Sequence, residues 1–342
     1  MVFGRRAQNL MISIVVTAYN VERYIAKCLD SIIGQSFKDI EIIVVDDGST
    51  DKTYDICNEY ASRFDNVRIL HTDNNGILLA RLNGVRDAVG DWIMFVDGDD
   101  LLPAYSLEIL NLLNKEQFDI VGGNIALEGN VVISYPRPVL NSREEYLVSL
   151  LDSNTYPGCC AKLIRKDLFI GFNDLDKSIT QNEDLLMMSL LAEKAESIFI
   201  QNQLPVYYYL SRPGSESKRT AQPICSWLSL FREVKKVVAT FNSNSLNIAY
   251  STYVINRLFH FCIQRGNFIN VDDLKIMQIL DLIDPESLPN ASRKKLKCIN
   301  NLFRQHIARL QYLFLNSIKS IGRVVIYNML KLGKDQVLGK LY

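Results

Sequence analysis

Blocks of apolar and polar positions alternate along the first hundred residues. Four short apolar, β-branched runs predict buried strands at 11–17, 40–45, 67–71 and 92–96. Between them, apolar residues at helical spacing predict helices over 22–33 and 76–89, and a third that starts after the N-cap residues 49–51 and reaches about residue 64. Strands that are apolar on both faces and alternate with helices predict an α/β fold. We therefore expect a mostly parallel, Rossmann-like sheet with helices on both faces.

A polar cluster follows each of the four predicted strands. The clusters lie at 17–20, 46–49, 73–76 and 97–100. The carboxyl ends of parallel strands meet at one edge of a sheet, and open α/β sheets bind ligands there. The opposite edge has only short connectors, at 38–39 and 90–91. Ordinary solvated turns would place polar residues at both edges, so the pattern favours a nucleotide-type site.

The fourth cluster places three carboxylates in four positions, at Asp97, Asp99 and Asp100. Like charges this close raise one another's pKa unless a cation lies among them. The sequence has no GxGxxG after the first strand and no GxxxxGK[ST], so a bound diphosphate needs another source of positive charge. Mg²⁺ or Mn²⁺ held by Asp97 and Asp99 would supply it, because both ions prefer hard oxygen ligands. Gly98 would let the backbone approach closely.

Charge is divided unevenly along the 342 residues. Residues 291–342 contain 11 Lys and Arg and one acidic residue, whereas residues 1–290 contain 27 basic and 37 acidic residues, so the net charge of zero hides a basic tail. An apolar stripe from Phe303 to Leu332, with basic residues off the stripe, predicts a basic amphipathic helix. Either this helix lies on an anionic membrane surface, or it packs its stripe on the rest of the protein. Nucleic acid is not expected as a partner.

Helical spacing also predicts helices at 226–241, 246–268 and 271–282, so the C-terminal region is expected to be α-helical. The seven cysteines form no CxxC pair, which predicts reduced thiols. The sequence has no apolar run near the ~20 residues of a membrane helix, and its N-terminal pattern does not predict a signal peptide. We expect a cytoplasmic protein, peripheral on the cytoplasmic face of a bacterial inner membrane.

Four segments together resemble the family 2 nucleotide-sugar glycosyltransferases, which are inverting enzymes with the GT-A fold. They are SIVVTAYNVERYIAKCLDSIIGQSF, IEIIVVDDGSTDKT, NNGILLARLNGVRDAVGDWIMFVDGDD and NEDLL. The resemblance covers residues 11–215. It implies a GT-A catalytic domain at 1–220, with a nucleotide-sugar half at about 1–100 and an acceptor half at about 101–220. A helical C-terminal region at 221–342 follows.

The resemblance also implies roles for particular residues. Asp97 and Asp99 match the DxD metal motif, and Asp99 would be the direct ligand of Mg²⁺ or Mn²⁺. Asp184 in NEDLL matches the catalytic base, with Glu183 beside it as the competitor. The residues expected to bind the nucleotide sugar are Thr17, Tyr19, Glu22, Asp46, Asp47, Asn74, Gly76, Arg81, Asp97, Gly98 and Arg212.

Several of these residues have a structural alternative. Tyr19 would only pack, Asp46 and Asp47 would only cap the second helix, and Arg81 would only pair with Asp87 or Glu22. The segment YYYLSRPGSESKR, which contains Arg212, is either a loop that contacts donor phosphates or a basic linker between domains.

The expected function is metal-dependent, inverting transfer of a sugar from a UDP-sugar, of the glucose or galactose type, to a lipid-diphosphate-linked or surface-polysaccharide acceptor. A carboxylate base would take the proton of the acceptor hydroxyl, and a metal would stabilise the leaving diphosphate. One rival is a sugar-nucleotidyltransferase, but TAYNVERY is not the glycine-rich basic loop that such an enzyme should carry after its first strand. The other rival is a non-catalytic scaffold that binds nucleotide sugars.

Overall fold

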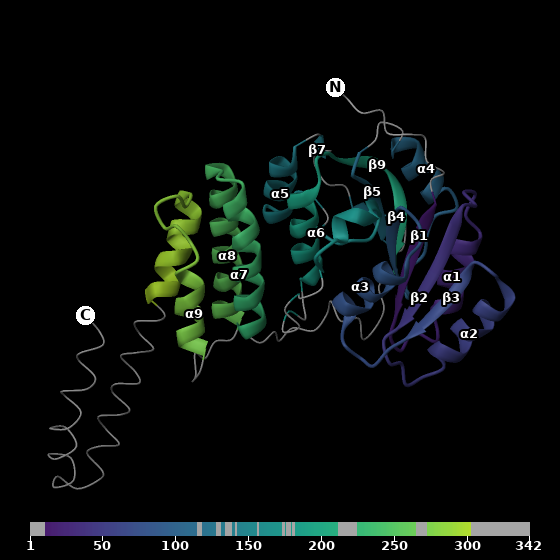
Figure 1. The fold of residues 1–342 in the computed structure, drawn as a ribbon. Coiled ribbons are helices and arrows are strands. Elements are labelled where there is room, and N and C mark those ends of the chain that lie inside the picture. The colour runs from purple at the N-terminus through teal and green to yellow at the C-terminus, as the bar shows by residue number, and fades with distance from the viewer. Residues whose placement is uncertain are drawn as a thin grey trace, which may run out of the picture.

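The structure is a computed structural model (Figure 1). It describes residues 11–114, 118–127, 131–133, 139–140, 142–155, 157–172, 175, 179, 182–210, 224–264 and 272–301. Its centre is a nine-stranded sheet with the order β3-β2-β1-β4-β8-β5-β9-β7, and β6 pairs with β5 outside this path. The strands are β1 Ile12–Ala18, β2 Ile40–Asp46, β3 Val67–His71, β4 Trp92–Asp97, β5 Ile120–Leu127, β6 Val131–Ile133, β7 Val139–Leu140, β8 Lys162–Arg165 and β9 Ile198–Tyr209.

The four N-terminal strands agree with the sequence prediction to within one residue at each end. They pair in parallel, and every residue of β1 and β2 is buried because both faces of these central strands are covered. The register aligns Ala18 with Asp46, Asp46 with His71, and Thr17 with Asp97. The polar clusters after these strands therefore meet at one edge of the sheet, as the alternating pattern predicted.

Helices α1 Ile25–Ile33, α2 Thr53–Arg63 and α3 Ile77–Asp87 connect these strands. The first helix starts three residues later than predicted because residues 21–24 form a turn, in which the backbone N–H of Tyr24 donates to the Val21 carbonyl at 2.8 Å. The N-cap position of the second helix is Lys52, one residue after the predicted 49–51, although the Asp51 carboxylate accepts the backbone N–H of Thr53, the first helical residue, at 2.9 Å. Gly84 of α3 allows close packing on β1, because a Cβ there would lie 2.3 Å from Val15 Cγ1.

The second half of the sheet is mixed in direction. Strand β8 pairs antiparallel with both β4 and β5, whereas β9 runs parallel to β5. Helix α4 (Ser106–Leu113) packs on β5 and β9, and the helices α5 (Arg143–Leu151) and α6 (Glu183–Lys194) lie beside each other. The short 3₁₀ helix η2 (Lys166–Phe169) follows β8 directly. The sheet with its helices has the GT-A type of α/β architecture that the sequence predicted.

The C-terminal region is helical, as predicted. It contains α7 Ile224–Thr240, α8 Asn244–Gln264 and α9 Asp272–Leu280, followed by a helical stretch at 290–301. Helix α7 packs on α6, and α8 packs on α5, so this region sits against the second half of the sheet domain (Figure 1). The predicted amphipathic helix from Phe303 to Leu332 lies outside the described residues. Across the ranges that the structure describes, no helix is both long and apolar enough to span a bilayer.

Candidate active site

Asp97 ends β4 at the edge where the polar clusters meet. Its Oδ1 accepts hydrogen bonds from Thr17 Oγ1 at 3.1 Å and from Arg81 Nη2 at 3.0 Å. Gly98 is explained by packing on β1: its N–H donates to the Thr17 carbonyl at 2.8 Å, and a Cβ at residue 98 would lie 2.9 Å from that oxygen. The close backbone approach predicted for Gly98 is therefore made to β1.

Arg81 links the carboxylate turn to the predicted base. Its side chain, on α3, is 1% exposed, and its Nη1 donates to Asp184 Oδ1 at 2.7 Å while Nη2 binds Asp97. Burial opposes the positive charge, but the carboxylates of Asp184 and Asp97 raise the pKa of Arg81 well above its usual range. The pairing of Arg81 with Asp87 or Glu22 is wrong, because its guanidinium binds Asp184 and Asp97 and Asp87 pairs with Arg68 instead. A contact between Arg81 and a nucleotide stays a prediction.

Replacing Arg81 with methionine is expected to destabilise the fold by about 3 kcal/mol, because it removes the cation and leaves partly buried carboxylates facing one another. Urea unfolding measures the loss. The loss should shrink between pH 8 and pH 5, because burial and the charge of Asp184 raise the pKa of Glu183 to about 7, and protonation of Glu183 below that pH removes part of the repulsion. A loss that is equal at both pH values would contradict this account.

Glu183 and Asp184 begin α6, directly after Asn182, which adopts the left-handed conformation with φ 57°. Asp184 Oδ1 accepts the thiol of Cys159 at 2.8 Å and the backbone N–H of Cys159 at 3.4 Å, in addition to Arg81. Every described hydrogen bond to the Asp184 carboxylate ends on Oδ1. Within the described part of the chain, none of these hydrogen bonds is made to the other oxygen, Oδ2.

Asp100 has a structural role in the carboxylate turn. Its carboxylate is buried and accepts the Tyr207 hydroxyl and the Leu210 backbone N–H, each at 2.8 Å. Burial first, and then the charge of Asp97, raise the pKa of Asp100 to about 8. The Tyr207 oxygen also accepts the backbone N–H of Asp97 at 3.0 Å. The hydroxyl of this β9 residue therefore links both ends of the carboxylate turn, Asp97 and Asp100.

The donor set of this turn fits a divalent cation that keeps several ligands from solvent or substrate. Among the described residues, no three His, Cys, Asp or Glu side chains converge as a closed metal site would require. Asp97 and Asp99, each half-buried, offer carboxylate oxygens on the same turn, and the Oδ1 of Asp97 is already bound to Arg81 and Thr17. Mg²⁺ and Mn²⁺ take one or two carboxylates with water and phosphate oxygens, which suits these two residues.

Asp47 and Asp46, predicted together, lie in different environments. The Asp47 carboxylate accepts the backbone N–H groups of Asn75 at 2.9 Å and Gly76 at 2.8 Å, and so holds the loop before α3. Asp46 is fully buried, and its Oδ2 lies 2.7 Å from Nδ1 of His71. Asp46 exposes no side-chain surface to a ligand, so its burial argues against the predicted contact with a nucleotide, which stays a prediction. Neither residue caps α2.

Glu22 contacts the residue before α2, since its Oε2 accepts the backbone N–H of Lys52 at 3.0 Å. Tyr19 is 40% exposed, so it does not simply pack in the core. Asn74 and Gly76 are exposed at the same edge of the sheet, and Gly76 has φ +88°, which glycine adopts without strain. Arg212 and the rest of its loop lie outside the described residues.

Three contacts of the site were not predicted from the sequence. They involve His71, Cys159 and Tyr207. The pairs that they form are separated by 25 to 107 positions along the chain, so no local pattern marks them. Tyr207 sits in the aromatic run 207–209, which was a visible but unspecific signal.

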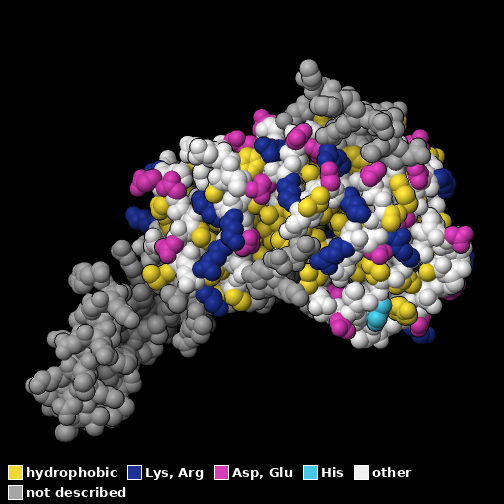
Figure 2. Space-filling view, in the orientation of Figure 1, with side chains coloured by type: hydrophobic (Ala, Val, Ile, Leu, Met, Phe, Trp, Pro, Cys, Tyr) yellow, Lys and Arg dark blue, Asp and Glu magenta, His cyan; other side chains and the backbone are white. Residues whose placement is uncertain are grey.

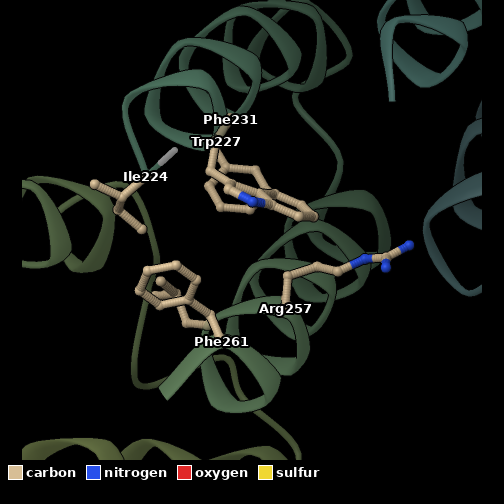
Figure 3. Close-up of a pocket in the computed structure, with 6 residues that line it drawn as sticks. Ile224, Trp227, Phe231, Arg257 and Phe261 are labelled. Atoms are coloured by element: carbon tan, nitrogen blue, oxygen red, sulfur yellow. The ribbon is translucent and has the colours of Figure 1, made fainter. Parts of the chain in front are cut away.

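A shallow apolar pocket lies away from this site, between α7 and α8 (Figure 3). It is lined by Ile224, Trp227, Phe231, Arg257, Leu258 and Phe261. Arg257 extends over the Trp227 and Tyr253 rings at 5.6 and 5.2 Å, a cation–π arrangement that joins the two helices. The lining contains no carboxylate, so the pocket has no part in the acid–base chemistry of the site.

An α/β sheet with a carboxylate turn at its carboxyl edge, facing a second carboxylate pair, is the arrangement of the GT-A class. The fold matches that of S. aureus TarS residues 1–349, solved in complex with UDP-GlcNAc, at a TM-score of 0.68 and 18% identity over 88% of this chain and 92% of that chain. A model of the family described as Glycosyl transferase family 2 matches residues 13–172.

Sequence relatives lead to the same family. The chain is 38% identical over 222 residues to glycosyltransferase GlyG of Streptococcus pneumoniae, covering 60% of this chain and 72% of GlyG. It is 28% identical over 252 residues to the minor teichoic acid biosynthesis protein GgaB of Bacillus subtilis, covering 72% of this chain but 27% of GgaB. The chain belongs to glycosyltransferase family 2. It covers less than two thirds of several of its relatives.

Proposed function

We propose that this protein transfers a sugar from a UDP-sugar to a hydroxyl of a cell-surface polysaccharide or its lipid-linked precursor, with inversion at the anomeric carbon. One observation carries the proposal. Arg81, from α3, holds Asp97 of the β4 turn and Asp184 of α6 within hydrogen-bond distance of a single guanidinium. The residues suited to the leaving diphosphate and to the attacking hydroxyl are therefore neighbours, as in-line displacement requires.

In the proposed reaction, Asp184 Oδ2 accepts the proton of the acceptor hydroxyl as that oxygen attacks the anomeric carbon. Arg81 and the Cys159 thiol hold Oδ1, which fixes the orientation of the carboxylate without neutralising Oδ2. Asp97 and Asp99 would hold Mg²⁺ or Mn²⁺, which when bound offsets the charge on the leaving diphosphate. With one base and one displacement, the product has the inverted anomeric configuration.

The donor class is supported by the residues at the carboxyl edge of the sheet and by the related structure. TarS is a structural relative that was solved with UDP-GlcNAc. Here, exposed Tyr19, Asn74 and Gly76 lie at the carboxyl edge beside the Asp97 turn, where an open α/β sheet binds a nucleotide. Titrating UDP with and without Mn²⁺ tests this part: metal-dependent binding is expected, and a scaffold with a degenerate site would bind UDP equally in both conditions or not at all.

The acceptor class rests on relatives and on charge. GgaB is named for teichoic acid biosynthesis, and the chain carries its excess of Lys and Arg towards the C-terminus. In the described region, Figure 2 shows Lys and Arg side chains gathered over α7 and α8. The helical stretch 290–301 contributes four more basic residues, Arg293, Lys294, Lys295 and Lys297. A basic surface of this kind favours the anionic face of a membrane, where lipid-linked acceptors are found.

Deleting residues 302–342 is expected to weaken binding to anionic vesicles while UDP affinity stays unchanged. Each Lys or Arg near an anionic surface contributes about 1 kcal/mol of attraction, so loss of several basic residues should weaken vesicle binding strongly. Co-sedimentation with vesicles of anionic and of neutral lipid measures the effect, and the neutral vesicles are the control. Unchanged sedimentation, or loss of folding in the truncated protein, would support packing of the tail on the body instead.

A further inference from the structure

Lys162 is a buried cation beneath the candidate site. It begins β8, its side chain is 2% exposed, and burial lowers its pKa to about 8. Transfer of an ammonium group out of water costs several kcal/mol, so a fold retains one where it makes specific hydrogen bonds. Gly122 of the paired strand provides the space, since a Cβ at residue 122 would lie 3.2 Å from Lys162 Cγ.

The ammonium group binds the turn that precedes it. Lys162 Nζ donates to the Gly158 carbonyl at 2.6 Å and lies 3.5 Å from the Cys160 carbonyl. The same turn contains Ala161 at φ +62°, a left-handed conformation that costs a non-glycine residue about 1–2 kcal/mol. A strained backbone of this kind persists only where its surroundings hold it in place, and Lys162 supplies two of the contacts that do so.

This turn places Cys159 against Asp184, the predicted base. The Cys159 thiol and backbone N–H both donate to Asp184 Oδ1, at 2.8 and 3.4 Å. The next residue, Cys160, forms a backbone bridge with Phe95, two positions before Asp97. Lys162 therefore determines the position of a turn that contacts Asp184 on one side and the strand bearing Asp97 on the other.

We propose that Lys162 is a positioning residue for sugar transfer: by fixing the 158–161 turn, it holds the Cys159 donors on Asp184 Oδ1 and so keeps Oδ2 turned towards the acceptor. The inference rests on the proposed function and extends it. Lys162 binds carbonyls of the turn, so it acts on Asp184 through the turn. A misplacement of about 1 Å at a reacting group can cost ~10²-fold in rate, which sets the scale of the effect.

A double-mutant cycle with Asp184→Asn tests the proposal. In the wild-type background, Lys162→Met is expected to lower kcat by ~10- to 10²-fold and to leave the donor KM and the UDP affinity within about twofold. In the Asp184→Asn background, the same change should lower the residual rate by less than about twofold, because the base through which Lys162 acts is already lost. Lys166→Met is the matched control, since Lys166 also binds a backbone carbonyl, that of Ala88, but at the opposite edge of the sheet.

Equal losses in the two backgrounds, or an unchanged kcat in folded Lys162→Met, would overturn the inference. Because a buried methionine at residue 162 could prevent folding, a second pair of variants changes Cys159, the residue of the turn that donates to Asp184. Cys159→Ser keeps a donor for Asp184 and should retain kcat within about threefold, whereas Cys159→Ala should lower it by ~10-fold. Equal rates in these two variants would also overturn it. Absence of transfer by the wild-type protein would refute the proposed function instead, while UDP binding reports on the donor site in every variant.

Discussion

Replacing Asp184 with asparagine is expected to leave UDP affinity nearly unchanged and to lower sugar transfer by about 10²- to 10⁴-fold, the range for a lost general base. A base acts on the acceptor proton in the transition state and contributes little to holding the donor. Asparagine keeps an oxygen that can accept from Arg81 and Cys159, so the fold around α6 should be retained. Isothermal titration with UDP and a transfer assay on the same preparation measure both quantities.

Glu183→Gln is the matched control, because Glu183 adjoins Asp184 and Arg81 but is not assigned as the base. Burial and the charge of Asp184 raise its pKa to about 7, a value at which a general base is effective at neutral pH. If Glu183 were the base, transfer would rise as pH increases through about 7, and Glu183→Gln would abolish both activity and that rise. Loss of transfer in Glu183→Gln together with its survival in Asp184→Asn would reassign the base to Glu183.

The Glu183 carboxyl also has a consequence for stability. Its pKa in the folded protein lies above the usual value of 4.5, so its contribution to stability is fully present below pH ~4.5 and is lost as pH rises through about 7. The ionised Glu183 carboxylate therefore destabilises the folded protein at neutral pH. It does so although it lies in the first turn of α6, where the helix dipole favours a carboxylate. The neighbouring Asp184 and burial outweigh the dipole.

Asp99→Asn is expected to abolish the dependence of UDP binding on Mn²⁺ and to lower turnover by at least ~10²-fold, given what a Lewis acid contributes to diphosphate departure. An amide oxygen carries no charge, so it holds a divalent cation far more weakly than a carboxylate does. UDP affinity measured across a series of Mn²⁺ concentrations is the direct readout. Asp91→Asn is the control, because Asp91 is an exposed carboxylate at the opposite edge of the sheet. Unchanged Mn²⁺ dependence in Asp99→Asn would contradict the assignment of the metal site.

The architecture of the nucleotide half could be predicted from the sequence because it follows from local pattern. Continuous apolar runs such as the one ending at Val45 can be satisfied only by a strand covered on both faces. Once the strands are parallel, geometry alone brings Thr17 and Asp97 to the same edge, and the register places them opposite each other. The three C-terminal helices were predictable for the same reason, from apolar spacing.

The partners of individual side chains could not be predicted in this way. Asp46 and Asp47 are adjacent in sequence, yet successive residues at the end of a strand point to opposite faces. Asp46 is therefore buried and binds the exposed His71, whereas Asp47 holds the loop before α3. The contact of Arg81 with Asp184 could not be predicted, because the two residues are 103 positions apart. In the sequence, nothing distinguishes Lys162 from the other basic residues of AKLIRK. Its burial in the structure is what sets it apart.

The central claim is that this chain transfers sugar from a UDP-sugar, and the most direct test is release of UDP from a panel of UDP-sugars with and without a lipid-diphosphate-linked or polyol-phosphate acceptor, in the presence of Mn²⁺. The account predicts acceptor-dependent UDP release from at least one donor, a product of inverted anomeric configuration by NMR, and loss of both in Asp184→Asn. Formation of a UDP-sugar from UTP and a sugar phosphate, or the absence of acceptor-dependent release from every donor while UDP still binds, would contradict it.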